Sequence, residues 1–137
     1  MKKISPAGKI IATVKCPASK SYTNRALLIA ALADGISTLR NPLLSDDTKY
    51  MRLALEQFGV PVRQENCAFV VSGTGGRIKC PPNEISISLA GTTMRFLTTF
   101  AALSPATTRL TGEKRMLERP ISDLLQALHQ LGVNAIS

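Results

Sequence analysis

Two short segments combine small hydroxyl residues with cations at positions where a helix is expected to begin. The first is Ser19-Lys20-Ser21 with Arg25 one turn later, and the second is Ala90-Gly91-Thr92-Thr93 with Arg95 close behind. Free backbone N–H groups and the positive dipole end of a helix N-terminus bind anions, and nearby hydroxyls and cations strengthen such a site. A phosphate or carboxylate group is therefore the expected ligand of both segments.

The placement of the two arginines favours this interpretation. A cation near a helix N-terminus is disfavoured by the dipole by about 0.3–1 kcal/mol. For either segment alone, plain N-caps and surface arginines explain the pattern equally well, but the same unfavourable placement occurs twice. Each charge-assisted hydrogen bond contributes about 1.5–3 kcal/mol, so three or four of them on one phosphate suffice for specific binding.

A third segment, residues 112–120 (GEKRMLERP), places three cations and two carboxylates between an expected strand and an expected helix. Its composition alone fits a solvated loop. Elsewhere the sequence contains no nucleophile–base pair, no Walker loop and no cluster with metal-ligand spacing. His129 has no partner at ligand spacing and is expected to be solvated. The sequence therefore predicts anion binding without a metal, and no catalytic residue within residues 1–137.

Periodicity and turn residues predict the elements that must position these segments. The helix at 22–33 is apolar on every side, which predicts that it is buried against both a sheet and other helices. The helix at 45–58 has Ser45 as N-cap and a single apolar stripe, and Gly59 ends it. In chain order the first half is expected to form a strand at 9–15, the helix at 22–33, a strand at 36–39, the helix at 45–58, and a hairpin of strands at 60–63 and 67–71.

The second half resembles the first. It is expected to form a strand at 84–88, a helix from about 91 to 103, a strand at 107–111, a helix from Pro120 to Leu131, and a strand that begins at Val133. The stretch 54–60 (ALEQFGV) matches 127–133 (ALHQLGV) at five of seven positions. An internal duplication with an offset of about 70 residues follows, and a period of that length indicates two βαβα-type units in one domain.

The sequence thus predicts an α/β protein in which residues 1–137 form a single domain. Repeat one covers about 9–72, and repeat two covers about 77–137 and is incomplete.

The composition and charge limit the classes of partner that the chain is expected to bind. Seventeen Lys and Arg against nine Asp and Glu give a net charge of +8, which favours anionic partners. The cations are spread along the chain and no aromatic residues interleave with them, so small anions are favoured over nucleic acid. No apolar run is long enough for a membrane span. The three cysteines, Cys16, Cys67 and Cys80, show no disulfide or zinc spacing, and a cytoplasmic setting is expected.

Four blocks, in this order, resemble signature blocks of the 5-enolpyruvylshikimate-3-phosphate synthase (EPSP synthase) family. They are PASKS with NRALL at 17–28, SDDT at 45–48, AGTTMR at 90–95, and GE, RM and ERPI within 112–121. The similarity spans nearly the whole chain but only the first portion of a family member, which is roughly three times as long. Two positions depart from the family pattern: Ala18 replaces the usual Gly, and Leu89 replaces an Asn found in many members.

The resemblance implies repeated βαβαββ units of the enolpyruvyl transferase inverse-barrel type, with two domains that close on the substrates. It implies transfer of the enolpyruvyl group of phosphoenolpyruvate to shikimate 3-phosphate without a cofactor. By the family pattern Lys20 contacts both substrates, Ser21 and Arg25 hold shikimate 3-phosphate, and Gly91 and Arg115 hold phosphoenolpyruvate. Supporting electrostatic roles are expected for Thr92, Arg95 and Arg119.

The family's acid–base carboxylate comes from the later part of a member, so activity is expected only with that part. A second polypeptide would otherwise have to supply that carboxylate, whereas a homodimer would only cover the strands that the chain lacks. The alternatives are a non-catalytic phosphate-binding fragment, one half of a split enzyme, and an RNA-binding module of related fold. UDP-N-acetylglucosamine enolpyruvyl transferase is disfavoured by the Ser-Lys-Ser and Arg-Met-x-Glu-Arg-Pro blocks.

Overall fold

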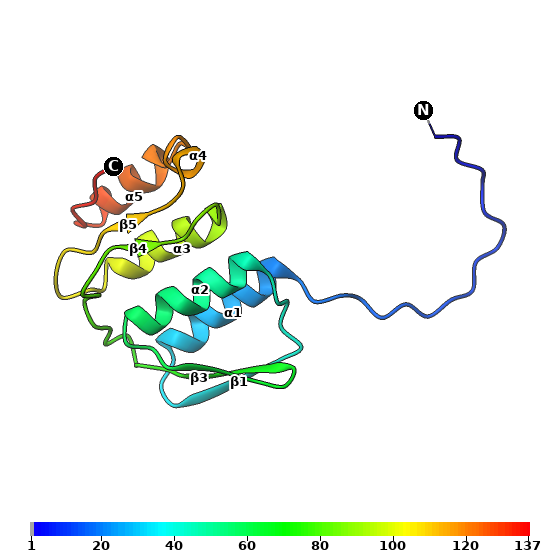
Figure 1. Ribbon diagram of the computed structural model, residues 1–137, viewed down its shortest axis with the longest axis horizontal. Helices are drawn as coiled ribbons and strands as arrows, with labels where there is room; N and C mark the ends of the chain where they lie inside the picture. The colour runs from blue at the N-terminus through cyan, green and yellow to red at the C-terminus, as the bar shows by residue number, and fades with distance from the viewer. Residues whose placement is uncertain (1) are drawn as a thin grey trace.

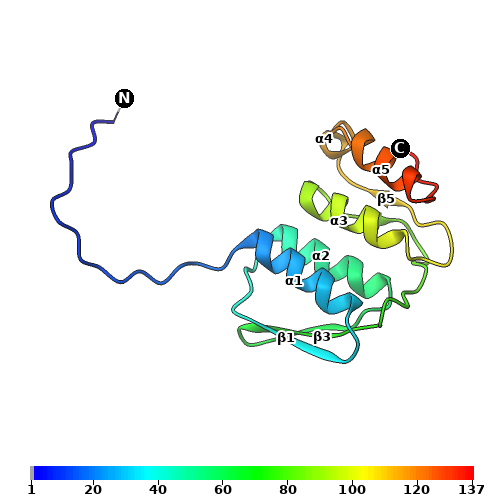
Figure 2. The same ribbon diagram turned by 180° about the vertical axis from the view of Figure 1, so that it is seen from behind.

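A computed structural model describes residues 2–137, and its folded body begins at Lys20. Figure 1 shows a layered arrangement in which a β-sheet lies on one side of α1 and α2, and α3, a strand pair and α5 follow on the other side. The reverse view gives the same order of layers (Figure 2). The helices are α1 (Lys20–Leu32), α2 (Asp46–Gln57), α3 (Gly91–Ala101), α4 (Lys114–Leu117) and α5 (Ser122–Gln130). The strands are β1 (Ile36–Arg40), β2 (Val62–Glu65), β3 (Ala68–Ser72), β4 (Ile85–Ser86) and β5 (Leu110–Thr111).

The larger sheet confirms the predicted hairpin. Its order is β1-β3-β2 and both pairings are antiparallel, with Glu65 opposite Ala68 across a two-residue turn. Asn66 in that turn has a φ of 48°, a left-handed conformation that asparagine tolerates. Phe69 and Val71 of β3 are buried in the core. The helices α1 and α2 therefore pack against one face of this sheet.

The core is built mainly from α2 and its neighbours. Met51, Leu55 and Phe58 are fully buried, and the Phe58 ring meets that of Phe100 edge to face at 5.2 Å between centroids. Leu97 of α3 joins the same cluster. Since edge-to-face pairs fix the relative placement of two rings, this contact ties α2 firmly to α3.

The helix α1 packs against the rest of the protein with one side only. Leu27, Ala30 and Ala31 face the core, but Tyr22 and Ile29 are 79% and 68% exposed. The prediction that this helix packs against both a sheet and other helices is confirmed, and its outer side is exposed. The described chain offers α1 only one packing surface, which the sheet and the helices α2 and α3 provide.

Two predicted strands do not form. Residues 9–15 run away from the body as an extended segment (Figure 1), and Ile10, Ile11 and Val14 are exposed. Residues 133–137 are likewise irregular, and the backbone oxygen of Ala135 lies 2.6 Å from Nε2 of His129. A strand is held by a neighbouring strand, and within residues 2–137 no other strand pairs with either segment.

The two strands of the second half are present but short. β4 and β5 pair in parallel over two residues each, instead of the predicted 84–88 and 107–111. Ser88 has a φ of 52°, which turns the chain out of the strand direction soon after β4. The last helix begins at Ser122, two residues after Pro120, and the unpredicted short helix α4 precedes it. None of the described helices has the length and apolar character needed to cross a membrane.

The Thr48 hydroxyl fixes the start of α2 and gives a stability prediction. Thr48 is 1% exposed, and its Oγ1 accepts from the backbone N of Ser45 at 3.0 Å and donates to the Leu43 carbonyl at 2.8 Å. Replacing it with the isosteric valine is expected to lower the free energy of unfolding by about 1–3 kcal/mol, because two backbone groups lose their partner. Chemical denaturation measures this change.

Thr99 provides the matched control. It is exposed, and its hydroxyl bonds only to the Arg95 carbonyl within its own helix. Thr99→Val is expected to change stability by less than about 0.5 kcal/mol. Equal effects of the two substitutions would contradict a specific role for Thr48.

Candidate functional site: a junction of three helix N-termini

Three helices begin on the same side of the molecule (Figure 1). The Nζ atom of Lys20, at the start of α1, lies 3.4 Å from Oδ1 of Asp47 in the first turn of α2. Thr93, in the first turn of α3, donates its hydroxyl to the Asp47 carbonyl at 3.2 Å. These contacts bring the positive ends of three helix dipoles together, which favours negative charge at this junction.

The first predicted segment forms the start of α1. Ser19 is the N-cap and accepts from the backbone N of Tyr22 at 3.4 Å. Thr23 accepts from the backbone N of Leu43 at 2.9 Å, which holds the loop before α2 against this turn. Lys20 and Ser21 are exposed, so their polar groups are open to a ligand. Ala18, one of the departures from the family pattern, is half-buried beside them.

Arg25 reaches back along α1 and across to α3. Its Nη1 donates to the Ser21 carbonyl at 3.1 Å, and its guanidinium carbon lies 5.4 Å from the centroid of the Phe96 ring. The side chain is exposed despite these two contacts. Arg25 therefore connects the first predicted segment with the helix that the second segment opens.

The second predicted segment opens α3 without a side-chain cap. A Cβ atom at Gly91 would lie 2.6 Å from Nη1 of Arg119, so the absence of a side chain gives the guanidinium its place against the first helical turn. Thr92 is half-buried in the same turn. Arg119 thus lies closer to the start of α3 than its position in the sequence indicates.

The third segment is not a free loop. It forms the short helix α4, whose buried Met116 packs against Gly91 and Gly112. Arg95 donates to the Pro120 carbonyl at 2.7 Å, and Ser88 donates to Oε1 of Glu113 at 2.5 Å. These contacts hold α4 against the start of α3 and carry the exposed Arg115 with it.

A pocket of about 330 Å³ lies beside the junction. It is lined by Asp46, Asp47, Tyr50, Ser88, Leu89, Ala90 and Glu113. Leu89, the second departure from the family pattern, presents an apolar side chain here. The pocket walls are acidic, whereas the cations Lys20, Arg25, Arg115 and Arg119 lie outside it.

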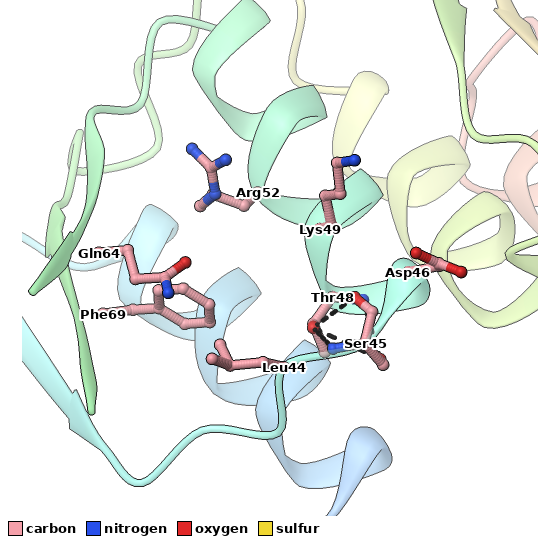
Figure 3. Close-up of a pocket in the computed structure, with 8 residues that line it drawn as sticks. All are labelled: Leu44, Ser45, Asp46, Thr48, Lys49, Arg52, Gln64 and Phe69. Atoms are coloured by element: carbon pink, nitrogen blue, oxygen red, sulfur yellow. Dashed lines mark hydrogen bonds between the residues drawn. The ribbon is translucent and has the colours of Figure 1, made fainter. Parts of the chain in front are cut away.

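A larger hollow of about 660 Å³ lies between α2 and the sheet (Figure 3). Figure 3 shows Lys49 and Arg52 from α2, with Gln64 and Phe69 from the sheet on the other side. It contains none of the predicted site residues, and Arg52 is paired with Glu56 at 2.7 Å. The hollow is larger than the pocket beside the junction. The predicted residues Ser21 and Thr92 and the uncapped start of α3 nevertheless make the junction the better candidate.

The structure connects the predicted residues through partners that the sequence reasoning did not single out. Lys20 is linked to α3 through Asp47, Arg25 contacts α3 through Phe96, and Gly91 lies against Arg119. The Asp46-Asp47 pair in the second signature block was a usable signal for Asp47. Phe96 offers no comparable signal. Among residues 2–137 no group of three or more His, Cys, Asp and Glu side chains could hold a metal ion.

Comparison with known proteins gives a consistent result. The sequence pattern of the family described as EPSP synthase (3-phosphoshikimate 1-carboxyvinyltransferase) matches residues 4–137. A protein named 3-phosphoshikimate 1-carboxyvinyltransferase from Methanothermobacter thermautotrophicus is 43% identical over 134 residues, which cover 98% of this chain and 32% of the relative. A protein of the same name from Nostoc sp. is 46% identical over 124 residues, covering 89% of this chain and 29% of the relative.

The fold agrees as well. The solved structure of EPSP synthase from Acinetobacter baumannii superposes with a TM-score of 0.81 at 23% sequence identity, over 86% of this chain and 27% of that one. The mixed helix and strand architecture is therefore that of this fold, and the chain spans about a third of the length of its curated relatives, corresponding to their N-terminal portion. Because the family pattern matches almost every residue, the chain belongs to the EPSP synthase family.

Proposed function

We propose that this chain is the N-terminal, substrate-binding portion of a 3-phosphoshikimate 1-carboxyvinyltransferase. That enzyme transfers the enolpyruvyl group of phosphoenolpyruvate to the 5-hydroxyl of shikimate 3-phosphate and releases phosphate. The observation that carries the proposal is the junction of three helix N-termini with Lys20, Arg25 and Arg119 around it. Both substrates are small phosphorylated anions, which such a junction suits.

The proposed roles follow the two segments. Lys20 would contact both substrates, because its side chain stands where α1 and α2 begin and its pairing with Asp47 keeps it between them. Ser21 and Arg25 would hold shikimate 3-phosphate at the start of α1. Gly91 and Arg115 would hold phosphoenolpyruvate at the start of α3, with Thr92 and Arg119 adding N–H groups and positive charge nearby.

Arg95 is assigned a supporting role for a structural reason. Its Nη2 already donates to the Pro120 carbonyl at 2.7 Å, so part of its hydrogen-bonding capacity braces the segment that carries Arg115. A fixed cation near the phosphates would add long-range attraction without direct contact.

The proposal includes the organisation of the chain. Residues 1–137 would form a single domain, with repeat one at about 9–72 and an incomplete repeat two at about 77–137. The order helix, strand, helix recurs as α1, β1, α2 and as α3, β5, α5, which supports the duplication. The remainder of the site would come from the later part of a family member or from a second polypeptide, and a second copy of the chain would only cover missing strands. A cytoplasmic setting belongs to the same proposal.

Titration of shikimate 3-phosphate into the purified chain tests the role of Lys20. Lys20→Met is expected to weaken the affinity about tenfold or more, because one charge-assisted hydrogen bond is lost. The substitution also leaves the Asp47 carboxylate without its cation, and that negative charge would repel the phosphate. Isothermal titration calorimetry measures the difference.

Lys79→Met is the matched control. Lys79 lies against Gly59, just beyond the C-terminal end of α2, and carries the same charge. Its replacement lowers the net charge equally and is expected to leave the affinity nearly unchanged. Equal affinities of the wild-type chain and Lys20→Met would remove Lys20 from the site.

A further inference from the structure

The pair formed by Arg25 and Phe96 joins the two predicted segments directly. The guanidinium carbon of Arg25 lies 5.4 Å from the Phe96 ring centroid, within the range of a cation–π contact. Phe96 is half-buried and packs against the hydrophobic core, so its ring is held in place. Arg25 is exposed and reaches the ring from the neighbouring helix α1.

The ring limits where the guanidinium can go. A free arginine side chain loses up to about 2 kcal/mol of rotamer freedom when it is fixed on a ligand. Here the Phe96 face and the Ser21 carbonyl, 3.1 Å from Nη1, already hold Arg25 near the start of α1. The guanidinium has five N–H donors and gives one of them to Ser21, so the others stay available for an anion.

We propose that Phe96 is a positioning residue for Arg25, and that its ring sets the affinity of the α1 junction for shikimate 3-phosphate. Phe96 itself touches no substrate and acts through the guanidinium. Because Phe96 belongs to α3, which Gly91 opens, the geometry of one anion-binding segment depends on the placement of the other. This inference rests on the proposed function of Arg25.

The test compares Phe96→Leu with Phe96→Tyr. Leucine removes the π face and keeps an apolar side chain, whereas tyrosine keeps the ring. Phe96→Leu is expected to weaken binding of shikimate 3-phosphate about two- to five-fold, which corresponds to an exposed cation–π contact. Phe96→Tyr is expected to bind as the wild-type chain does.

A double-mutant cycle separates positioning from general damage. In an Arg25→Gln background, Phe96→Leu is expected to have no further effect on the affinity, because the group it positions is gone. If Phe96→Leu weakens binding equally in both backgrounds, it acts through the fold of α3 and the proposal is overturned. Failure of Phe96→Tyr to restore the affinity would overturn it as well.

A readout without ligand keeps this inference distinct from the proposed function. In NMR spectra of the free chain, the δ-methylene protons of Arg25 are expected to lie upfield of their position in Phe96→Leu, because the ring shields them. Unshifted resonances in the wild-type chain would overturn the positioning by Phe96 whatever the chain binds. Shifted resonances together with no binding of shikimate 3-phosphate or inorganic phosphate would instead refute the proposed function, and the role of Phe96 in affinity with it.

Discussion

Purified alone, the chain is expected to release no phosphate from a mixture of shikimate 3-phosphate and phosphoenolpyruvate above the uncatalysed rate. The cations and helix ends at the junction are proposed to bind and orient anions, and the Asp47 carboxylate there is paired with Lys20. Chemistry requires in addition a group that moves protons, and by the family resemblance that carboxylate lies in the later part of the enzyme. Relative to a complete enzyme, the expected loss is at least about 10⁶-fold. A continuous phosphate-release assay measures it.

The control for this prediction is to add the remaining part of the enzyme to the chain. The chain spans about a third of its relatives, so a polypeptide carrying the remaining two-thirds of a family member is expected to restore phosphate release when added. The same mixture prepared with Lys20→Met is expected to release phosphate far more slowly. Robust turnover by the chain alone would contradict the proposed division of the site. No restoration, with substrate binding intact, would favour a non-catalytic phosphate-binding fragment.

Elements whose signals are local were predicted closely. Helix α2 has its N-cap at Ser45, acidic residues in its first turn, and an apolar stripe that includes Met51 and Leu55, and the structure confirms each of these features. The β2–β3 hairpin also formed within two residues of its predicted bounds, with its turn at residues 66 and 67 rather than at the predicted 64–66. In both cases neighbouring residues alone determine the structure.

Elements that need distant partners were predicted less well. Residues 9–15 have strand composition, but a strand also requires a neighbour, and composition does not identify one. The helix α4 is only four residues long, and its stability depends on Met116 packing against Gly91 and Gly112 from other parts of the chain. No periodic pattern predicts a helix of that kind.

The candidate site likewise has local features that the sequence predicted and long-range contacts that it did not predict. The two helix-opening segments were recognisable because their small residues and cations are close together in sequence. The contacts of Lys20 with Asp47 and of Arg25 with Phe96 join positions far apart in sequence, on different helices. The order of the elements along the chain does not determine which side chains meet across a helix pair. That choice depends on the packing of α1, α2 and α3.

Gly73 and Gly91 differ in what an added side chain would meet, which is the fixed backbone at Gly73 and a flexible side chain at Gly91. A Cβ atom at Gly73 would lie 2.1 Å from the Ala33 carbonyl oxygen and 2.6 Å from that of Ala30, both in the backbone at the end of α1. A Cβ atom at Gly91 would meet only the far end of the Arg119 side chain at a comparable distance, 2.6 Å from Nη1. Backbone held by hydrogen bonds moves at a high cost, whereas the end of a flexible side chain moves readily.

Gly73→Ala is therefore expected to lower the free energy of unfolding by about 3 kcal/mol or more, at the upper end of the cost of overpacking. The melting temperature should fall by roughly 10 °C. The Ala33 carbonyl cannot retreat easily, because it accepts from the backbone N of Gly75 at 2.9 Å, while Gly73 itself donates to the Gly35 carbonyl at 2.8 Å. Thermal denaturation followed by circular dichroism measures the change.

Gly91→Ala is expected to behave in the opposite way. Alanine is favoured over glycine in a helix by roughly 0.5–1 kcal/mol, which offsets part of the displacement of Arg119, so the melting temperature should change little. The displaced guanidinium no longer lies against the first turn of α3, so phosphoenolpyruvate should bind more weakly to this variant than to the wild-type chain. If Gly91→Ala unfolds as readily as Gly73→Ala, Gly91 serves the fold. If it is stable and binds phosphoenolpyruvate normally, the space beside Gly91 has no part in anion binding.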